Sequence, residues 1–129
     1  MTDAEVAEHI ENLKSRIDPD MRWSHIDCES GWYRLIVDCD KELLSLDPHY
    51  VPVQIKQKFG GLRYYYDTNA DEETALKMRE VVDKYEALSV QTCEISGQPG
   101  KLMNCRGFYQ TLSPLHTPTY AQEVKHHVK

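Results

Sequence analysis

The sequence has no long apolar stretch and no excess of positive charge. No window approaches the ~18 apolar residues of a membrane span, and the first residues lack the basic start and apolar run of a signal peptide. The 129 residues contain 15 Lys and Arg against 21 Asp and Glu, a formal net charge of −6. Sequence-independent binding to DNA needs a dominant positive field, so we do not expect nucleic acid as a partner. Since the sequence also shows no membrane span and no signal peptide, we expect a cytoplasmic protein that does not bind a membrane.

Cysteine is sparse, and the motifs of the common enzyme classes are missing. The four cysteines, Cys28, Cys39, Cys93 and Cys105, are widely spaced, so we expect free thiols. The sequence contains no glycine-rich phosphate loop, no G-x-S-x-G nucleophile elbow and no internal repeat. These absences favour a protein that is not an enzyme.

What the sequence does contain is a strong helical pattern. The hydrophobic share of 40% and the charged share of 28% are those of an ordinary globular domain. Apolar residues recur at helical spacing over residues 2–17, 30–46 and 70–89. Thr2 and Glu5 fit a capping box at the first helix, and Asn69 is the expected N-cap of the third. The second helix places Cys39 on its apolar stripe, as a core residue.

Residues 53–66 alternate between apolar and polar side chains, which predicts a β-hairpin. Phe59-Gly60-Gly61 supplies the positive backbone angles of its turn. We expect an inner face made of Val53, Ile55, Leu62, Tyr64 and Tyr66. The fold class is therefore α+β, with a small antiparallel sheet that is centred on this hairpin and covered by two or three helices.

The polar face of the hairpin is the first candidate site. Lys56, Lys58, Arg63 and Tyr65 are predicted to lie close together. Such a cluster can bind phosphate oxygens with its cations and stack a base on its tyrosine, which makes a phosphorylated small molecule a candidate ligand. The alternative interpretation is an exposed strand face whose lysines prevent edge pairing.

The second candidate site has the ligand spacing of a zinc ribbon. Positions 93 and 96 form one knuckle and positions 113 and 116 the other, with a Gly-Gln-Pro-Gly turn after the first. Cys93 and His116 are suitable metal ligands, but Ser96 and Ser113 are poor ones because a neutral hydroxyl lacks the charge and softness of a thiolate. Cys105 lies between the knuckles as a further candidate ligand.

Both motifs together resemble those of a family of small, mostly uncharacterised bacterial and phage proteins. In that family a "KFGGLR" hairpin and a helix precede C-x2-C-G-x-P-G and T-L-C-x2-H knuckles, and the resemblance covers residues 30–117. The resemblance puts the family's metal ligands at positions 93, 96, 113 and 116, where this chain has Cys, Ser, Ser and His. We therefore expect a degenerate lobe without a zinc cofactor, held by apolar packing of Ile95, Leu102, Phe108, Leu112 and Leu115.

The predicted organisation is one α+β domain over residues 1–117, whose residues 92–117 form the degenerate zinc-ribbon-like lobe, and a C-terminal tail over residues 118–129. The leading hypothesis is a phage or bacterial accessory protein that binds an unknown protein, inhibits a host or defence factor and, if phage-encoded, works in the host cytoplasm. Its expected contact patch uses Tyr64 to Tyr66, Phe108 or Tyr109. Capture of a nucleotide or another phosphorylated small molecule by the hairpin is the alternative.

Overall fold

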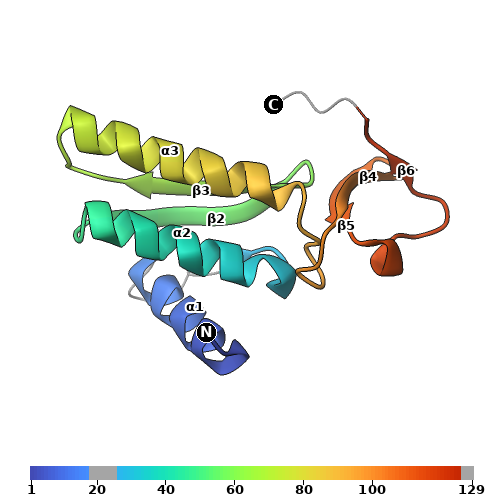
Figure 1. The fold of residues 1–129 in the computed structure, drawn as a ribbon, viewed down its shortest axis with the longest axis horizontal. Coiled ribbons are helices and arrows are strands. Elements are labelled where there is room, and N and C mark those ends of the chain that lie inside the picture. The colour runs from blue at the N-terminus through green and yellow to red at the C-terminus, as the bar shows by residue number, and fades with distance from the viewer. Residues whose placement is uncertain (18–25, 126–129) are drawn as a thin grey trace.

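The computed structural model describes residues 1–17 and 26–125, which form three α-helices and two small sheets (Figure 1). The helices are α1 (Asp3–Ile17), α2 (Tyr33–Leu46) and α3 (Glu72–Ser89). One sheet contains β1 (Ile26–Asp27), β2 (Val51–Lys58) and β3 (Gly61–Asp67), and the other contains β4 (Lys101–Cys105), β5 (Phe108–Leu112) and β6 (Gln122–Glu123). Two 3-10 helices, η1 (Ser30–Trp32) and η2 (Pro114–His116), complete the described chain. The predicted α+β fold is confirmed.

The helix starts follow local hydrogen bonding. At α1 the predicted capping box is present, because the Glu5 N–H donates to Thr2 Oγ1 at 3.1 Å and the Thr2 N–H donates to Glu5 Oε1 at 3.3 Å. The expected cap of α3 at Asn69 is wrong. The side chain of Asp71 caps this helix by accepting the N–H of Thr74 at 2.8 Å, since α3 begins only at Glu72.

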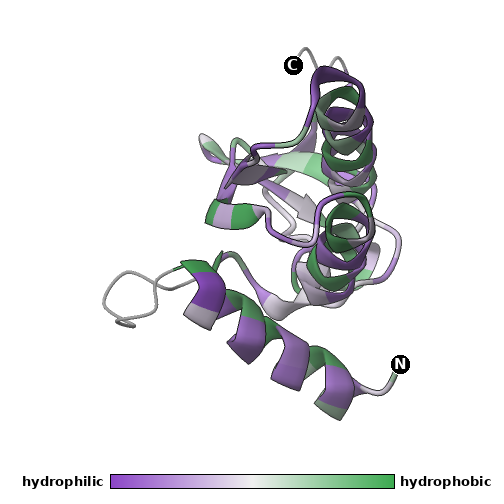
Figure 2. Ribbon diagram, turned by 90° about the vertical axis from the view of Figure 1, so that its left-hand side faces the viewer, coloured by the Kyte–Doolittle hydropathy of each residue, from purple (hydrophilic) through white to green (hydrophobic). Residues whose placement is uncertain are grey.

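All three helices pack against the inner face of the first sheet (Figures 1 and 2). Their apolar side chains share one core with the inner face of the strands, a core that includes Ile10, Leu13, Trp32, Ile36, Cys39, Leu43, Ile55, Leu62, Tyr64 and Met78. Figure 2 shows α1 with its hydrophobic side turned toward the rest of the molecule and its hydrophilic side turned away. Since full burial of one Leu or Ile side chain contributes about 1.5–3 kcal/mol, this interface supplies most of the folding stability.

The strand register explains one error in the sequence prediction. β2 and β3 are antiparallel, and a β-bulge between Pro52 and Gln54 interrupts their pairing. A bulge adds one residue to one strand and so reverses the alternation beyond it. Pro52 takes the inner position, and Val53, which was predicted to be inside, is 46% exposed. β1 joins β2 in parallel, so the sheet is mixed.

The hairpin turn docks into the second sheet. Phe59 and Gly60 form the two-residue loop between β2 and β3, with φ angles of 54° and 83°, whereas Gly61 is already the first residue of β3. A Cβ on Gly60 would lie 2.2 Å from Leu102 Cδ1. Thr111 Oγ1 donates to the carbonyl oxygen of Gly60 at 2.8 Å. The turn therefore needs glycine at position 60 for backbone conformation and for space.

A second set of contacts connects the lobe to η1, directly before the N-terminus of α2. Trp32 Nε1 donates to the carbonyl of Thr92 at 2.8 Å, and the Gly31 N–H donates to the carbonyl of Glu94 at 2.7 Å. The Glu94 carboxylate accepts the Glu29 N–H at 3.0 Å, and its other oxygen is buried with no hydrogen-bond partner among residues 1–17 and 26–125. Burial raises the pKa of Glu94. The lobe is therefore held at two separate places.

The tail takes part in the lobe as well. β6 lies within the predicted tail and pairs with β4, and the Val124 N–H donates to the Leu102 carbonyl at 2.9 Å. The lobe therefore extends past the predicted boundary at residue 117. The end of the predicted tail, residues 126–129, lies outside the described residues.

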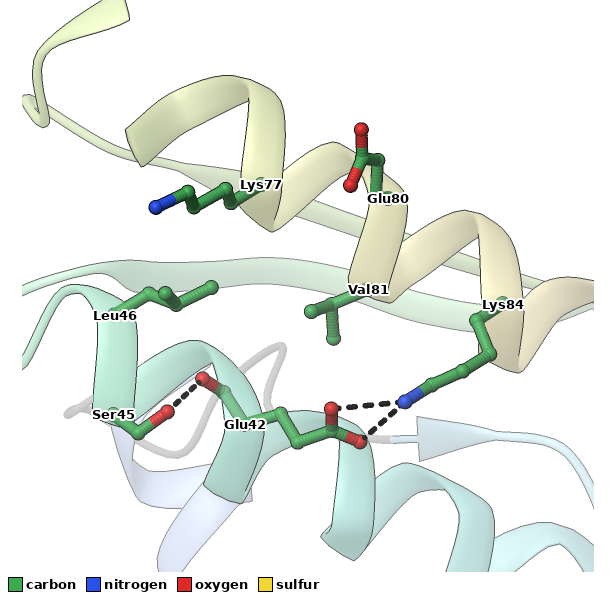
Figure 3. A pocket seen from close by; sticks show the side chains of 7 residues that line it. All are labelled: Glu42, Ser45, Leu46, Lys77, Glu80, Val81 and Lys84. Carbon is green, nitrogen blue, oxygen red and sulfur yellow. Dashed lines mark hydrogen bonds and ion pairs between the residues drawn. The ribbon is translucent and has the colours of Figure 1, made fainter. Parts of the chain in front are cut away.

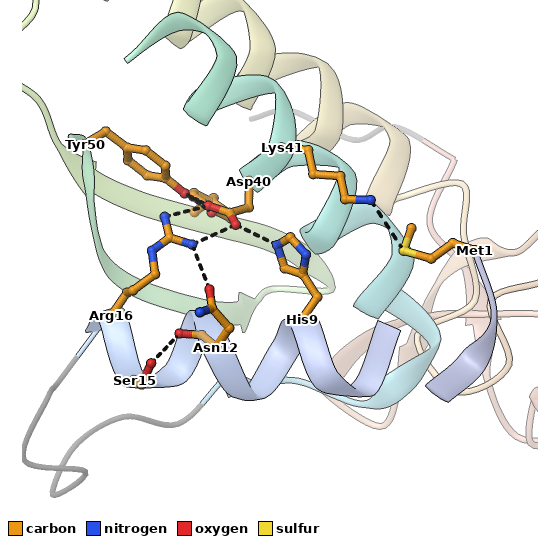
Figure 4. A network of polar contacts seen from close by, with 9 residues as sticks. Met1, His9, Asn12, Ser15, Arg16, Asp40, Lys41 and Tyr50 are labelled. Carbon is orange, nitrogen blue, oxygen red and sulfur yellow. Dashed lines mark hydrogen bonds and ion pairs between the residues drawn. The ribbon is translucent and has the colours of Figure 1, made fainter. Parts of the chain in front are cut away.

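A buried carboxylate fixes α1 (Figure 4). Asp40 on α2 has no exposed side-chain surface and accepts two hydrogen bonds from the Arg16 guanidinium, at 2.8 and 2.9 Å. His9 Nε2 lies 2.7 Å from the same carboxylate, and the Tyr50 hydroxyl donates to it. Tyr50 and Tyr64 share a further hydrogen bond of 2.6 Å. Burial would raise the pKa of Asp40, but the hydrogen bonds from Arg16, Tyr50 and His9 outweigh it and lower the pKa.

The two glycines of the hairpin turn give a matched test of the docking contact. We expect Gly60→Ala to lower the free energy of unfolding by about 2–3 kcal/mol, because it combines a left-handed conformation with a clash against Leu102. Gly61→Ala should lower the free energy of unfolding by about 1 kcal/mol or less, since the nearest atoms would lie 3.4 Å from the added Cβ. Urea denaturation of both variants measures the difference. Equal losses would show that the Gly60 contact with the lobe is unimportant.

The Asp40 network predicts a specific acid sensitivity. Asp40→Asn should cost about 3 kcal/mol at neutral pH, because Arg16 loses its buried counter-charge. A lowered pKa means that this stabilisation is complete above the ordinary value of 3.8 and is lost as pH falls through the folded-state pKa. Denaturant midpoints measured across the acid range should converge for wild type and variant. Asp38→Asn, on an exposed position of α2, is the control and should change little.

Candidate functional site

The four residues predicted for the hairpin site lie together on the outer face of β2 and β3. Lys56 stands directly opposite Arg63 in the antiparallel register, and Lys58 stands opposite Gly61 on the same side. Tyr65 is paired with Gln54, and Lys56 Nζ lies 5.9 Å from the centre of the Tyr65 ring. The sequence prediction of a shared basic and aromatic surface is therefore correct in geometry.

The same surface carries apolar side chains toward the far end of the strands. Tyr65 is 43% exposed, and Val51 and Val53 are 47% and 46% exposed. We call this surface the hairpin face and define it by Val51, Val53, Gln54, Lys56, Lys58, Arg63 and Tyr65. It is basic near the turn, and beyond Tyr65 it carries Val51 and Val53, with Asp67 in register with Val51.

The cations of the hairpin face differ in their contacts from the paired cations of the described chain. Within the part of the chain that the structure describes, Lys56, Lys58 and Arg63 form no ion pair. In the groove of about 410 Å³ between α2 and α3, by contrast, a lysine is paired with a carboxylate (Figure 3). There Lys84 Nζ lies 2.9 and 3.0 Å from the two carboxylate oxygens of Glu42. The three cations of the hairpin face contact neutral groups instead: Lys56 lies over the Tyr65 ring, Lys58 lies near the Phe59 ring, and Arg63 Nη1 donates to the Leu62 carbonyl at 3.2 Å.

α3 covers the free edge of β3. The Leu62 N–H donates to Ser89 Oγ at 2.9 Å, and the Tyr64 N–H donates to Glu86 Oε2 at 3.0 Å. Because these outward N–H groups are already bonded, a further strand cannot pair with this edge at these positions. The broad outer surface remains as the place for contact.

A groove of about 380 Å³ continues the hairpin face between β3 and α3. Its lining includes Arg63, Tyr65 and Arg79 but also Asp83 and Glu86. The two carboxylates make the groove less suited to phosphate than a cluster of cations alone would be.

Phe59, at the turn beside the hairpin face, has a strained backbone conformation. Its φ of 54° places it in the left-handed region, where a non-glycine residue costs on the order of 1 kcal/mol or more. Its side chain is 64% exposed and lies 5.7 Å from Lys58 Nζ, measured to the ring centre. An aromatic residue that is strained and yet exposed contributes little to folding, which points to a role in contact with another molecule.

The expected aromatic patch is only partly present. Tyr65 and Phe108 are exposed, at 43% and 54%. Tyr64, which was included in the patch, is 2% exposed because it faces the core and bonds to Tyr50. Tyr66 and Tyr109 are half-buried.

The two predicted knuckles meet around one thiol. The Ser96 N–H donates to Cys93 Sγ at 3.4 Å, and Ser113 Oγ lies 3.3 Å from His116 Nδ1. Burial would raise the pKa of Cys93, but hydrogen bonds from Ser113 and Ser96 outweigh it and lower the pKa to about 6. Hydroxyl donors therefore occupy the two positions where the resemblance puts further metal ligands.

Cys105, the third candidate ligand, pairs with Phe108 at the turn end of β4 and β5. Among residues 1–17 and 26–125, no three His, Cys, Asp or Glu side chains are grouped so that they could hold a metal ion. All four cysteines are free thiols.

The packing of the lobe differs from the expected one. Leu112 belongs to its small core with Cys93 and Met103, and Leu102 is buried against the hairpin turn. Ile95, Phe108 and Leu115 are exposed, at 37%, 54% and 88%. Their assignment to the core was wrong, because the small sheet of the lobe covers neither Phe108, at the start of β5, nor Ile95 and Leu115, which lie outside the strands.

Comparisons of the chain with protein-family models, with curated proteins and with solved structures found no match. No helix in the described part of the chain has both the length and the apolar character required to cross a membrane.

The predicted site did not include Val51, Val53 or Gln54, which belong to the hairpin face, or Phe59, which lies beside it at the turn. Val53 reaches the hairpin face only through the bulge, and alternation alone assigns it to the core. The sequence pattern assigns Phe59 only to the turn. A bulky apolar residue in a two-residue turn also indicates an exposed side chain that could contact another molecule.

Substitution of Phe59 tests whether the strained aromatic is retained for binding. Asparagine tolerates the left-handed conformation, so Phe59→Asn should raise the free energy of unfolding by about 0.5–1 kcal/mol. Phe108→Asn, at a similarly exposed aromatic in β5, should not stabilise the protein because its backbone is extended. Thermal denaturation distinguishes them. A loss of stability in Phe59→Asn would remove the argument from strain.

Proposed function

We propose that this protein is a non-enzymatic binding protein that recognises another protein through the hairpin face. The observation that carries the proposal is that one strand pair carries three cations, which form no ion pair with any described residue, beside the exposed side chains of Val51, Val53 and Tyr65. Arginine and tyrosine are enriched in protein interfaces, and a surface on strands keeps its shape before binding. The opposite face of the same strands is committed to the core.

The resemblance of the KFGGLR hairpin to a family of bacterial and phage proteins supports an accessory role. In that role, binding would inhibit a host or defence factor in the cytoplasm. The hairpin is intact in this chain, whereas the knuckles have lost two of the four ligand types that the resemblance implies. This difference favours the hairpin over the lobe as the working surface.

A phosphorylated small molecule is the second candidate ligand, since Lys56, Arg63 and Tyr65 lie together. Two features make it the weaker candidate. The hairpin face is an open surface, whereas small-molecule sites are usually enclosed. The adjoining groove contains Asp83 and Glu86, whose charge opposes a phosphate group.

Site-specific photo-crosslinking tests the proposed surface. A photoreactive amino acid in place of Gln54 lies on the hairpin face, and one in place of Leu76, which is 59% exposed on α3, is the matched control. In cells that encode the protein, we expect discrete crosslinked products from position 54 and none of the same products from position 76.

Competition makes this result specific. Excess unlabelled wild-type protein should abolish the products from position 54, and excess Lys56→Glu/Arg63→Glu protein should not. Identical products from both positions, or equal competition by the charge-reversed protein, would contradict the proposal.

A further inference from the structure

We infer that the partner segment bound at the hairpin face is acidic and extended. This inference rests on the proposed function and adds the chemistry of the partner. The whole chain is acidic, but this one surface carries three cations.

The hairpin face is a local positive region on an acidic protein. The chain has a formal net charge of −6, yet Lys56, Lys58 and Arg63 lie within two successive rows of the strand pair. Asp27 of β1 is in register with Lys56, and Asp67 lies opposite Val51 at the far end. Neither aspartate forms an ion pair with these cations, and the three cations outnumber the two carboxylates, so the surface around Lys56, Lys58 and Arg63 keeps an excess of positive charge.

The spacing of the cations indicates an extended ligand. Successive positions on one face of a strand are about 7 Å apart. Lys58 forms the first row, Lys56 with Arg63 the second, and Tyr65 with Gln54 the third. An extended peptide repeats at the same interval, so two alternate carboxylates can meet the cationic rows while the next alternate side chain contacts Tyr65.

The same geometry disfavours other anions. A single phosphate group can meet only the row of Lys56 and Arg63, whereas the three cations occupy two rows about 7 Å apart along the strands. A long nucleic acid would be repelled by the net negative charge of the remaining surface. An acidic peptide needs only the length of the hairpin face.

A fluorescent peptide of sequence Gly-Glu-Ser-Glu-Ser-Phe-Gly is the probe, and its counterpart with Gln in place of both Glu is the neutral control. Fluorescence anisotropy with the full chain should show binding of the Glu peptide that weakens as salt increases. Lys56→Gln/Arg63→Gln should weaken this binding roughly tenfold. Lys41→Gln/Lys77→Gln removes two exposed charges from α2 and α3 and should leave it unchanged.

Equal binding of the Glu and Gln peptides, or unchanged binding by Lys56→Gln/Arg63→Gln, would overturn the inference. Binding of ATP or of a single-stranded oligonucleotide in place of the peptide would overturn it as well. If the peptide fails while crosslinking from position 54 stays specific, only the acidic chemistry is wrong. If both fail, the proposed function is wrong too.

Discussion

The contact between the hairpin turn and the second lobe is the constraint on which the remaining geometry depends. Gly60 reaches Leu102 so closely that it has no room for a side chain, and its carbonyl accepts a hydrogen bond from Thr111. This contact holds the turn, and β2 and β3 pair along their length except at the bulge between Pro52 and Gln54. Their inner side chains complete the core, and their outer side chains are consequently presented in a fixed arrangement.

Stabilising and non-stabilising features are segregated on this hairpin. Asp40 shows the stabilising kind, because its buried charge is matched by Arg16, His9 and Tyr50 and fixes α1. The hairpin face shows the other kind. Phe59 is strained and exposed, and the cations Lys56, Lys58 and Arg63 form no ion pair with any residue that the structure describes. On the hairpin the costly feature is exposed, whereas a second strained residue, Arg106, lies in the turn between β4 and β5 of the lobe.

Much of the architecture could be predicted from the sequence because it depends on local periodicity. The three helices, the hairpin and the shared face of Lys56 and Arg63 follow from repeats of 3.6 and two residues. The bulge at Val53 and the pairing of β6 could not be predicted in this way, since both depend on hydrogen bonds between distant segments. The Asp40 cluster had a partial signal, because Asp40 lies four residues after Ile36 on the buried side of α2.

The central proposal is that the hairpin face binds the partner. Amide chemical-shift mapping of the isotope-labelled protein with a partner recovered by crosslinking tests this claim directly. The account predicts that the largest shifts fall on Gln54, Lys56, Arg63 and Tyr65, and that Leu43 in the core and the exposed Leu76 on α3 do not move. Shifts concentrated on the outer surfaces of α1 to α3, or on the lobe around Cys93, would contradict it.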